Sequence, residues 1–148
     1  MTTTETNRPT NERADRVIRQ HVAYAVAAAA VPVPLGDILA VTAVQLDLVR
    51  SLAELHRQRY DPESGKALVA ALTGVSVARI GASAFKAVPG VGTLVGGAAQ
   101  LTLSAASTYA IGKVFDRHFA GGGTLRDFDV AARRDEYERH VQEGTDPS

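Results

Sequence analysis

The sequence predicts an all-α protein: a helical bundle of two proline-broken helical hairpins followed by a charged C-terminal surface helix. Apolar residues recur at spacings of three and four along most of the chain, as in helices with one buried face. No stretch alternates polar and apolar residues for long enough to predict a strand. Prolines interrupt the apolar segments at Pro34 and Pro89, where the missing amide breaks a helix.

Size and composition fit one domain and narrow the classes of function. The chain has 148 residues, 45% of them hydrophobic, which is enough for one core. Sixteen basic and sixteen acidic residues cancel, so the net charge does not favour a nucleic-acid partner. Without cysteine the chain has no disulfide and no thiolate metal site, which fits a reducing cytosol.

Composition divides the chain into five predicted segments. The N-terminus is rich in threonine and lacks the apolar stretch of a signal peptide. We predict a disordered leader over 1–10, a helical hairpin-repeat domain over 11–120, a glycine linker over 121–123, a charged amphipathic helix over 124–142 and a disordered tail over 143–148.

Capping and breaking residues give the expected bounds of the first two helices. Thr10 or Asn11 can cap the first helix, and Pro32 ends it. Asp37 lies in the first turn of the second helix, where its charge complements the helix dipole. The amphipathic pattern then continues to about Tyr60.

The remaining helices carry start signals of their own. Asp61 followed by Pro62 is an N-cap with proline at the first helical position. Thr124 with Asp127 three residues later resembles a capping box. The expected bounds are Asp61 to about Phe85, about Leu94 to Phe119, and Thr124 to about Gln142, with Gly121 to Gly123 ending the fourth helix.

Alignment of the two apolar halves indicates an internal duplication. Laying Pro34 on Pro89 brings Gln45 onto Gln100 at a constant offset without a gap. A duplication would make two hairpins, from helices one and two and from helices three and four, related by a pseudo-two-fold axis. A chance match of two alanine- and leucine-rich helices is the alternative.

An uncharged stretch, Ala87 to Gly112, is longer than the roughly 20 residues needed to span a bilayer. It contains Gln100 and several glycines, and its mean hydropathy is about 1, low for a lone spanning helix. Gly92 and Gly96 form a GxxxG motif, which lets membrane helices approach, although soluble helices also cross at glycines. The sequence therefore leaves membrane association and a soluble bundle both open.

The sequence carries no pattern typical of catalysis or cofactor binding. Its two Gly-Lys pairs lack the earlier glycine of a P-loop. The four histidines lie far apart without a second ligand on the same helical face, so we expect no metal site. His56 and His118 lie near helix ends, where we expect them to cap the last turns. We expect no enzyme and no cofactor.

The candidate packing and interaction residues lie in the two hairpins. Glycines let neighbouring backbones approach, so leucine at Gly96 or Gly97 is expected to overpack by about 1 to 3 kcal/mol. The full set is Pro34, Asp37, Gln45, Pro89, Gly92, Gly96, Gly97, Gln100 and Gly112.

Several separated motifs resemble one family. They are Val31–Asp37 (VPVPLGD), Ala43–Leu46 (AVQL), Leu52–Leu55 (LAEL), Val88–Gly92 (VPGVG) and Thr108–Gly112 (TYAIG). They are similar to the uncharacterised bacterial domain often found behind GTPase domains, a family that includes the YcjF-type inner-membrane proteins. The resemblance covers roughly 14–119 and implies association with membranes and GTPases, without catalytic or ligand residues to carry over. Because no GTPase domain precedes Asn11, it implies coupling in trans.

The expected function is a non-catalytic, membrane-associated helical adaptor or scaffold, coupled in trans to a GTPase at the cytoplasmic face of the inner membrane. The alternative is a soluble, cytoplasmic, self-assembling bundle, a homo-oligomer in which the same small-residue faces meet. The expected partners are further copies of the chain, a GTPase and a lipid membrane, and no nucleic acid.

Overall fold

The computed structural model describes residues 3–30, 36–84 and 92–145, and the side chains of 8–30, 39–74 and 101–145. These residues form helices and no strand, so the predicted all-α class is confirmed. The helices are α1 (Thr3–Ala29), α2 (Gly36–Leu55), α3 (Pro62–Ala84), α4 (Gly92–Ala120) and α5 (Val130–Thr145).

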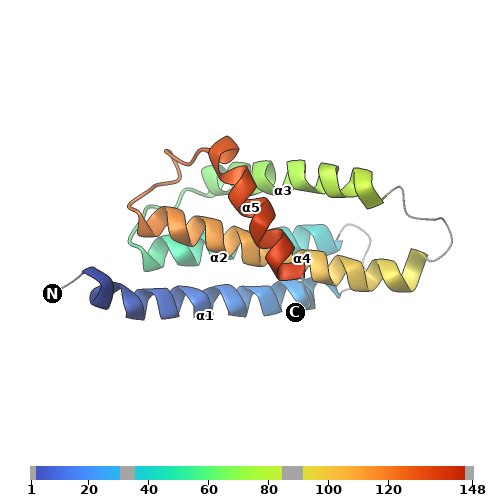
Figure 1. Ribbon diagram of the computed structural model, residues 1–148, viewed down its shortest axis with the longest axis horizontal. Helices are drawn as coiled ribbons and strands as arrows, with labels where there is room; N and C mark the ends of the chain where they lie inside the picture. The colour runs from blue at the N-terminus through green and yellow to red at the C-terminus, as the bar shows by residue number, and fades with distance from the viewer. Residues whose placement is uncertain (1–2, 31–35, 85–91, 146–148) are drawn as a thin grey trace.

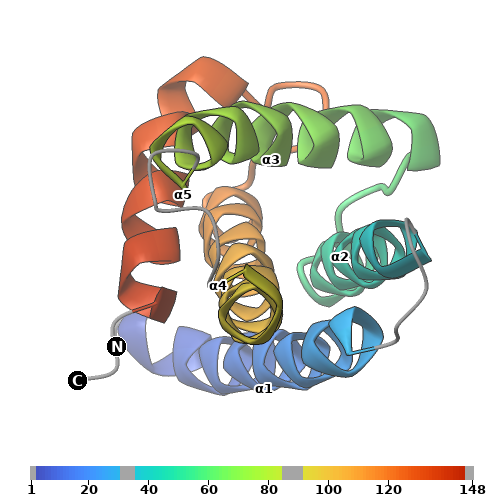
Figure 2. The ribbon, with the colours of Figure 1, turned by 90° about the vertical axis from the view of Figure 1, so that its right-hand side faces the viewer.

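Helix α4 runs through the centre of the bundle, with the other helices arranged around it (Figure 2). It packs against α1, α2 and α5, while α3 packs against α2 and α5. Every helix contributes a fully buried side chain to one core: Ile18, Leu52, Leu72, Phe115 and Tyr137. Burial of these large apolar groups is the main favourable term in the folding of the bundle.

The two predicted hairpins differ in the structure. Helices α1 and α2 pack together as an antiparallel pair, as expected. In the described residues α3 packs on α2 and α5 instead of forming a comparable pair with α4. The α1–α4 and α2–α3 contacts, which a pseudo-two-fold axis would exchange, both occur. The C-terminal ends of α1 and α3 and the N-terminal ends of α2 and α4 lie at one end, the tip end (Figure 1).

Helix α1 begins earlier than the sequence predicts. It starts at Thr3 instead of near Asn11, so the expected disordered leader over 1–10 is helical from Thr3 onward. Pro9 lies inside the helix. As the seventh helical residue it lies beyond the first four amides, which have no intrahelical partner, so it removes one backbone hydrogen bond near the start of the helix. The helix ends at Ala29, close to the expected end before Pro32.

Helix α2 ends at Leu55 and not near Tyr60 as predicted. Arg57 takes a left-handed conformation with φ 57°. The amide of Gln58 donates to the Ala53 carbonyl at 2.8 Å, and the Arg57 amide donates to the Glu54 carbonyl at 3.1 Å. This is a Schellman motif, which ends the helix although its left-handed position carries arginine in place of glycine.

The bounds of α3 and α4 agree with the prediction. Asp61 caps α3, because its carboxylate accepts a hydrogen bond from the Ser64 amide at 2.9 Å, and Pro62 is the first helical residue. Helix α4 ends in a second Schellman motif, with Gly122 at φ 84° and the Gly123 amide donating to the His118 carbonyl at 3.0 Å.

Helix α5 begins at Val130, later than the predicted start at Thr124. The reciprocal bonds expected between Thr124 and Asp127 do form, at 2.7 Å and 3.4 Å, but they close a turn. Asp129 is the actual cap, accepting from the Ala132 amide at 3.2 Å. The turn buries Phe128, which stacks on Phe115 with ring centroids 4.5 Å apart, and this burial outweighs the local preference for an early helix. The helix continues to Thr145, beyond the predicted end.

Candidate functional site

The structure describes the side-chain surroundings of two predicted candidates, Gln45 and Gly112. Pro34 and Pro89 lie outside the described residues. Asp37 lies in the first turn of α2, as expected. The other candidates lie in the N-terminal part of α4. The structure does not describe the surroundings of five candidates: Asp37, Gly92, Gly96, Gly97 and Gln100.

Gln45 begins a buried polar chain that joins three helices. Its side chain is 4% exposed, and its amide donates to the Ser107 hydroxyl at 3.1 Å and to the Thr108 hydroxyl at 3.3 Å. Ser107 Oγ in turn lies 2.8 Å from the Tyr137 hydroxyl. The Gln45–Ser107–Tyr137 chain therefore links α2, α4 and α5 and satisfies polar groups that would be costly to bury alone.

Tyr137 anchors α5 on the core. Burial raises the pKa of its hydroxyl, and the hydrogen bond with Ser107 only partly opposes this effect. The phenol at this position stays neutral, and either hydroxyl can donate in the bond between Tyr137 and Ser107. The geometry fits a structural link better than acid–base chemistry.

Gly112 lies at a close crossing of α4 and α1, as the sequence predicts for this glycine. A Cβ atom at this position would lie 2.7 Å from Cγ1 of Ile18 and 3.0 Å from its Cγ2. Gly144, which is not among the predicted candidates, has the same role between α5 and α4. A Cβ there would lie 2.9 Å from the Cα of Ala106. Small residues therefore let α1 and α5 approach the central helix closely.

Each of the four histidines pairs with a carboxylate, which was not predicted from the sequence. Three of these pairs join different elements of the fold, instead of capping the helix ends as expected for His56 and His118. The sequence contains no signal for the pairs of His21 and His56, because their partners are remote along the chain, whereas the spacing of three between His140 and Glu143 could have indicated that pair. The pairs are His21–Asp47 at 3.1 Å, His56–Asp116 at 2.6 Å, His118–Asp127 at 3.0 Å and His140–Glu143 at 2.8 Å.

His118 also organises the turn between α4 and α5. Its Nε2 lies 2.8 Å from the Thr124 carbonyl as well as 3.0 Å from Asp127 Oδ1. The hydrogen bond from the Thr124 amide is the largest cause that lowers the pKa of Asp127, and the hydrogen bond with the His118 side chain lowers it further. A Cβ on Gly123 would overlap the His118 ring, so glycine is required there for the turn to close.

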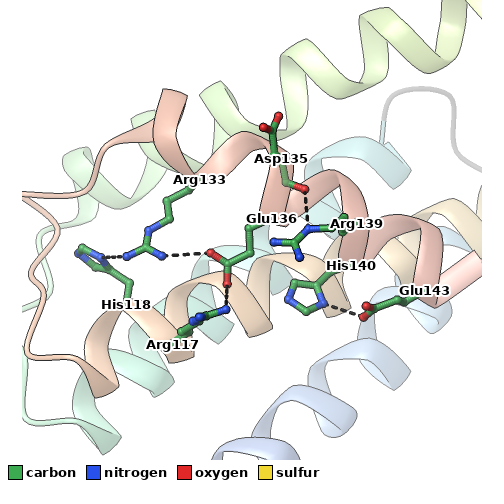
Figure 3. Close-up of polar contacts among 8 residues, drawn as sticks. All are labelled: Arg117, His118, Arg133, Asp135, Glu136, Arg139, His140 and Glu143. Carbon is green, nitrogen blue, oxygen red and sulfur yellow. Dashed lines mark hydrogen bonds and ion pairs between the residues drawn. The ribbon is translucent and has the colours of Figure 1, made fainter.

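A charged cluster joins α4 to α5 around Glu136 (Figure 3). Glu136 is 6% exposed and accepts from Arg133 at 3.1 Å and from Arg117 at 3.4 Å. Arg133 also approaches Nδ1 of His118 at 3.5 Å. Two guanidinium groups compensate the burial of one carboxylate, which fixes α5 on α4 without creating an unpaired buried charge. In the described part of the chain, no group of three or more acidic or histidine side chains could hold a metal ion.

The exposed side chains that the structure describes near the tip end of the α1–α2 pair are all apolar. Tyr24 is 51% exposed and Leu39 is 72% exposed. We call these residues the apolar tip surface. They comprise every exposed residue within 22–30 and 39–46: Ala23, Tyr24, Ala27, Ala30, Leu39 and Ala43.

Charge is concentrated away from the tip end. Of the sixteen basic and sixteen acidic residues, only Asp37, Arg79 and Lys86 fall within 22–46 and 67–112. The C-terminal end of α5, where Gly144 packs on Ala106, adds the exposed Glu143. The separation of charge along the molecule distinguishes this surface from scattered exposed apolar residues, which are normal on soluble proteins. None of the helices, over the residues described, is both long enough and apolar enough to cross a bilayer.

Comparisons with known proteins agree with this picture of a helical domain. The family described as a domain of unknown function, DUF697, matches residues 1–136. The chain is similar to magnetosome membrane protein 22 of Magnetospirillum gryphiswaldense, with 35% identity over 136 residues, which cover 88% of this chain and 70% of that protein. No solved structure matches the chain.

Proposed function

We propose, because this chain belongs to the DUF697 family of domains of unknown function, that it is a non-catalytic, membrane-associated helical scaffold. The observation that carries the proposal is the apolar tip surface, at the end of the molecule that lacks most of the charge. Exposed apolar surfaces of this kind mark contacts with membranes or other proteins. The similarity to a protein named as a magnetosome membrane protein favours a membrane.

The interior of the described residues supports a scaffold. Its buried polar groups are used to join helices: Gln45 bonds to α4, and Glu136 pairs with two arginines. The close crossings at Gly112 and Gly144 leave their helices in direct contact. These features hold elements together, whereas a reaction centre needs reactive groups that converge on a substrate.

Coupling to a GTPase in trans, at the cytoplasmic face of the inner membrane, is part of the same proposal. The sequence motifs that resemble the family of YcjF-type proteins support it. Affinity purification of the tagged chain from detergent-treated membranes, followed by a GTP-hydrolysis assay of the eluate, tests it. An eluate without GTPase activity would contradict this part of the proposal.

Self-assembly is the second candidate function, because Tyr24 and Leu39 could also be covered by another copy of the chain. Light scattering of the protein purified without detergent distinguishes the two candidates. A monodisperse multimer that does not bind lipid favours self-assembly.

Fractionation of cells that express the chain tests membrane association directly. We expect the protein to sediment with membranes, and a substantial part of it to stay there after a wash with alkaline carbonate, which removes proteins held by charge alone. Quantitative recovery in the soluble fraction before the wash would refute the proposed function.

A further inference from the structure

We propose that the apolar tip surface inserts into one leaflet of a phospholipid membrane, up to a boundary marked by His21 and Asp47, without crossing the bilayer. This inference rests on the proposed function. It goes further by specifying which residues contact lipid, how deep they reach, and which end of the molecule faces water.

The boundary is sharp on both helices of the pair. In α1 every exposed described residue before His21 is polar or charged apart from Pro9, and every exposed residue after it is apolar. In α2 the described residues begin at Leu39; those that are exposed before Asp47, Leu39 and Ala43, are apolar, and those from Asp47 onward are charged. The exposed residues on the charged side are Arg8, Asn11, Glu12, Arg13, Arg16, Arg19 and Gln20 in α1, and Asp47, Arg50, Glu54, Arg57 and Arg59 in and after α2.

The two changes lie at the same level of the molecule. Nε2 of His21 is 3.1 Å from Oδ2 of Asp47, so this pair spans α1 and α2 where both helices change character. On this pair of helices the change from charged to apolar exposed residues therefore falls at one common level. A flat lipid–water interface imposes a common level on neighbouring helices, whereas the outline of a protein partner would follow its own shape.

The length of the apolar part matches one leaflet. At about 1.5 Å per residue, α1 rises about 12 Å from His21 to Ala29, and α2 rises about 12 Å from Leu39 to Asp47. Half of the hydrocarbon core of a bilayer is about 15 Å thick. The backbone groups inside each helix bond within the helix, so they can enter hydrocarbon without losing their partners.

The side chains at the boundary suit the interface. Tyr24 lies one turn below it and contacts the His21 ring edge-on, with centroids 5.6 Å apart. Tyrosines favour this depth because the ring is apolar and the hydroxyl reaches water. Arg16 and Arg19 are exposed on the water side, where long basic side chains can reach lipid phosphates.

The absence of tryptophan from the chain makes a direct test available. Leu39→Trp places a single fluorophore on the apolar tip surface, and Ala131→Trp places one on the exposed first turn of α5 as a matched control. Both proteins are mixed with vesicles of phosphatidylethanolamine and phosphatidylglycerol that carry bromine at known depths on the acyl chains. We expect blue-shifted emission and bromine quenching for Leu39→Trp, and equal binding without quenching for Ala131→Trp.

The outcomes separate this inference from the proposed function. Vesicle binding by both variants without quenching of Leu39→Trp, or with equal quenching of both, overturns insertion but leaves membrane association standing. Absence of binding by either variant and by the unmodified chain overturns the proposed function itself.

Two matched substitutions to glutamate provide the second measurement. Ala27→Glu should weaken partitioning into the same vesicles at least about tenfold, because an acidic side chain is costly in hydrocarbon. Ala131→Glu makes the same chemical change on α5 and should leave partitioning unchanged. Circular dichroism confirms that both variants remain folded. If Ala27→Glu splits a multimer into monomers while vesicle binding stays the same, the surface is a contact between copies and the inference is wrong.

Discussion

At the scale of single residues, we expect substitution by alanine to have opposite effects on stability at Gly112 and at Gly74. We expect Gly112→Ala to lower the free energy of unfolding by about 1 to 3 kcal/mol, because the new methyl group would overlap Ile18. Gly74→Ala should raise it by up to about 1 kcal/mol, since a Cβ there meets nothing within 4 Å and alanine favours a helix interior. Urea unfolding of both variants measures the difference. A change in the same direction would contradict the close crossing.

Tyr137 should make the fold sensitive to alkali. Burial raises the pKa of Tyr137, so the unfolded chain releases this proton at a lower pH than the folded chain does. The resulting stability is complete below the ordinary tyrosine pKa of about 10 and is lost as the pH rises through the folded value. Tyr137→Phe should therefore show a shallower fall in Tm above about pH 10 than the unmodified protein. It should also cost about 1 kcal/mol at neutral pH through the lost bond to Ser107. Parallel alkaline curves would refute this explanation.

The sequence identified some of these residues but not their partners. Gly112 stands out as a glycine in an apolar helix, and Gln45 as a polar residue in one. Their contacts with Ile18 and Ser107 depend on how the helices pack, which local spacing does not encode. The His21–Asp47 and His56–Asp116 pairs and the contact of Glu136 with Arg117 were missed for the same reason, since these partners come from other helices.

At the scale of elements, the two Schellman motifs differ in the residue at the left-handed position. Arg57 adopts φ 57° and Gly122 adopts φ 84°. We expect Arg57→Gly to stabilise the fold by up to about 1 kcal/mol, because glycine lacks the Cβ that disfavours this conformation. Gly122→Ala should destabilise it by about 1 kcal/mol for the same reason. Differential scanning calorimetry of both variants, with Arg59→Gly as a control outside the motif, measures this. A loss of stability in Arg57→Gly would show that its side chain has a role beyond the motif.

Helix bounds were predictable where the signals are local and stand alone. Asp61 and Pro62 open α3 as predicted, because cap and proline act on adjacent residues. Thr124 and Asp127 form their bonds but do not start α5, since the core requires the turn that buries Phe128. The early end of α2 depends on an arginine in a left-handed conformation, which propensity does not favour.

At the scale of the whole molecule, the position of α4 determines how the bundle opens. The helix contacts α1, α2 and α5, and most of its residues from Ala106 to Phe119 are buried. No single neighbour can leave and expose all of it, whereas α3 packs only on α2 and α5 among the described contacts. The amides of 106–119 should therefore exchange with solvent only through global unfolding.

Hydrogen exchange measured by mass spectrometry across a urea series tests this order. We expect peptides from 106–119 to be the most protected and to share the urea dependence of global unfolding, because exposing them breaks contacts with three helices at once. Peptides from 62–74 in α3 should exchange through a smaller opening with a shallower urea dependence. If the α3 peptides were as protected as those of α4, the bundle would open as a single unit, and the central position of α4 would have no separate energetic effect.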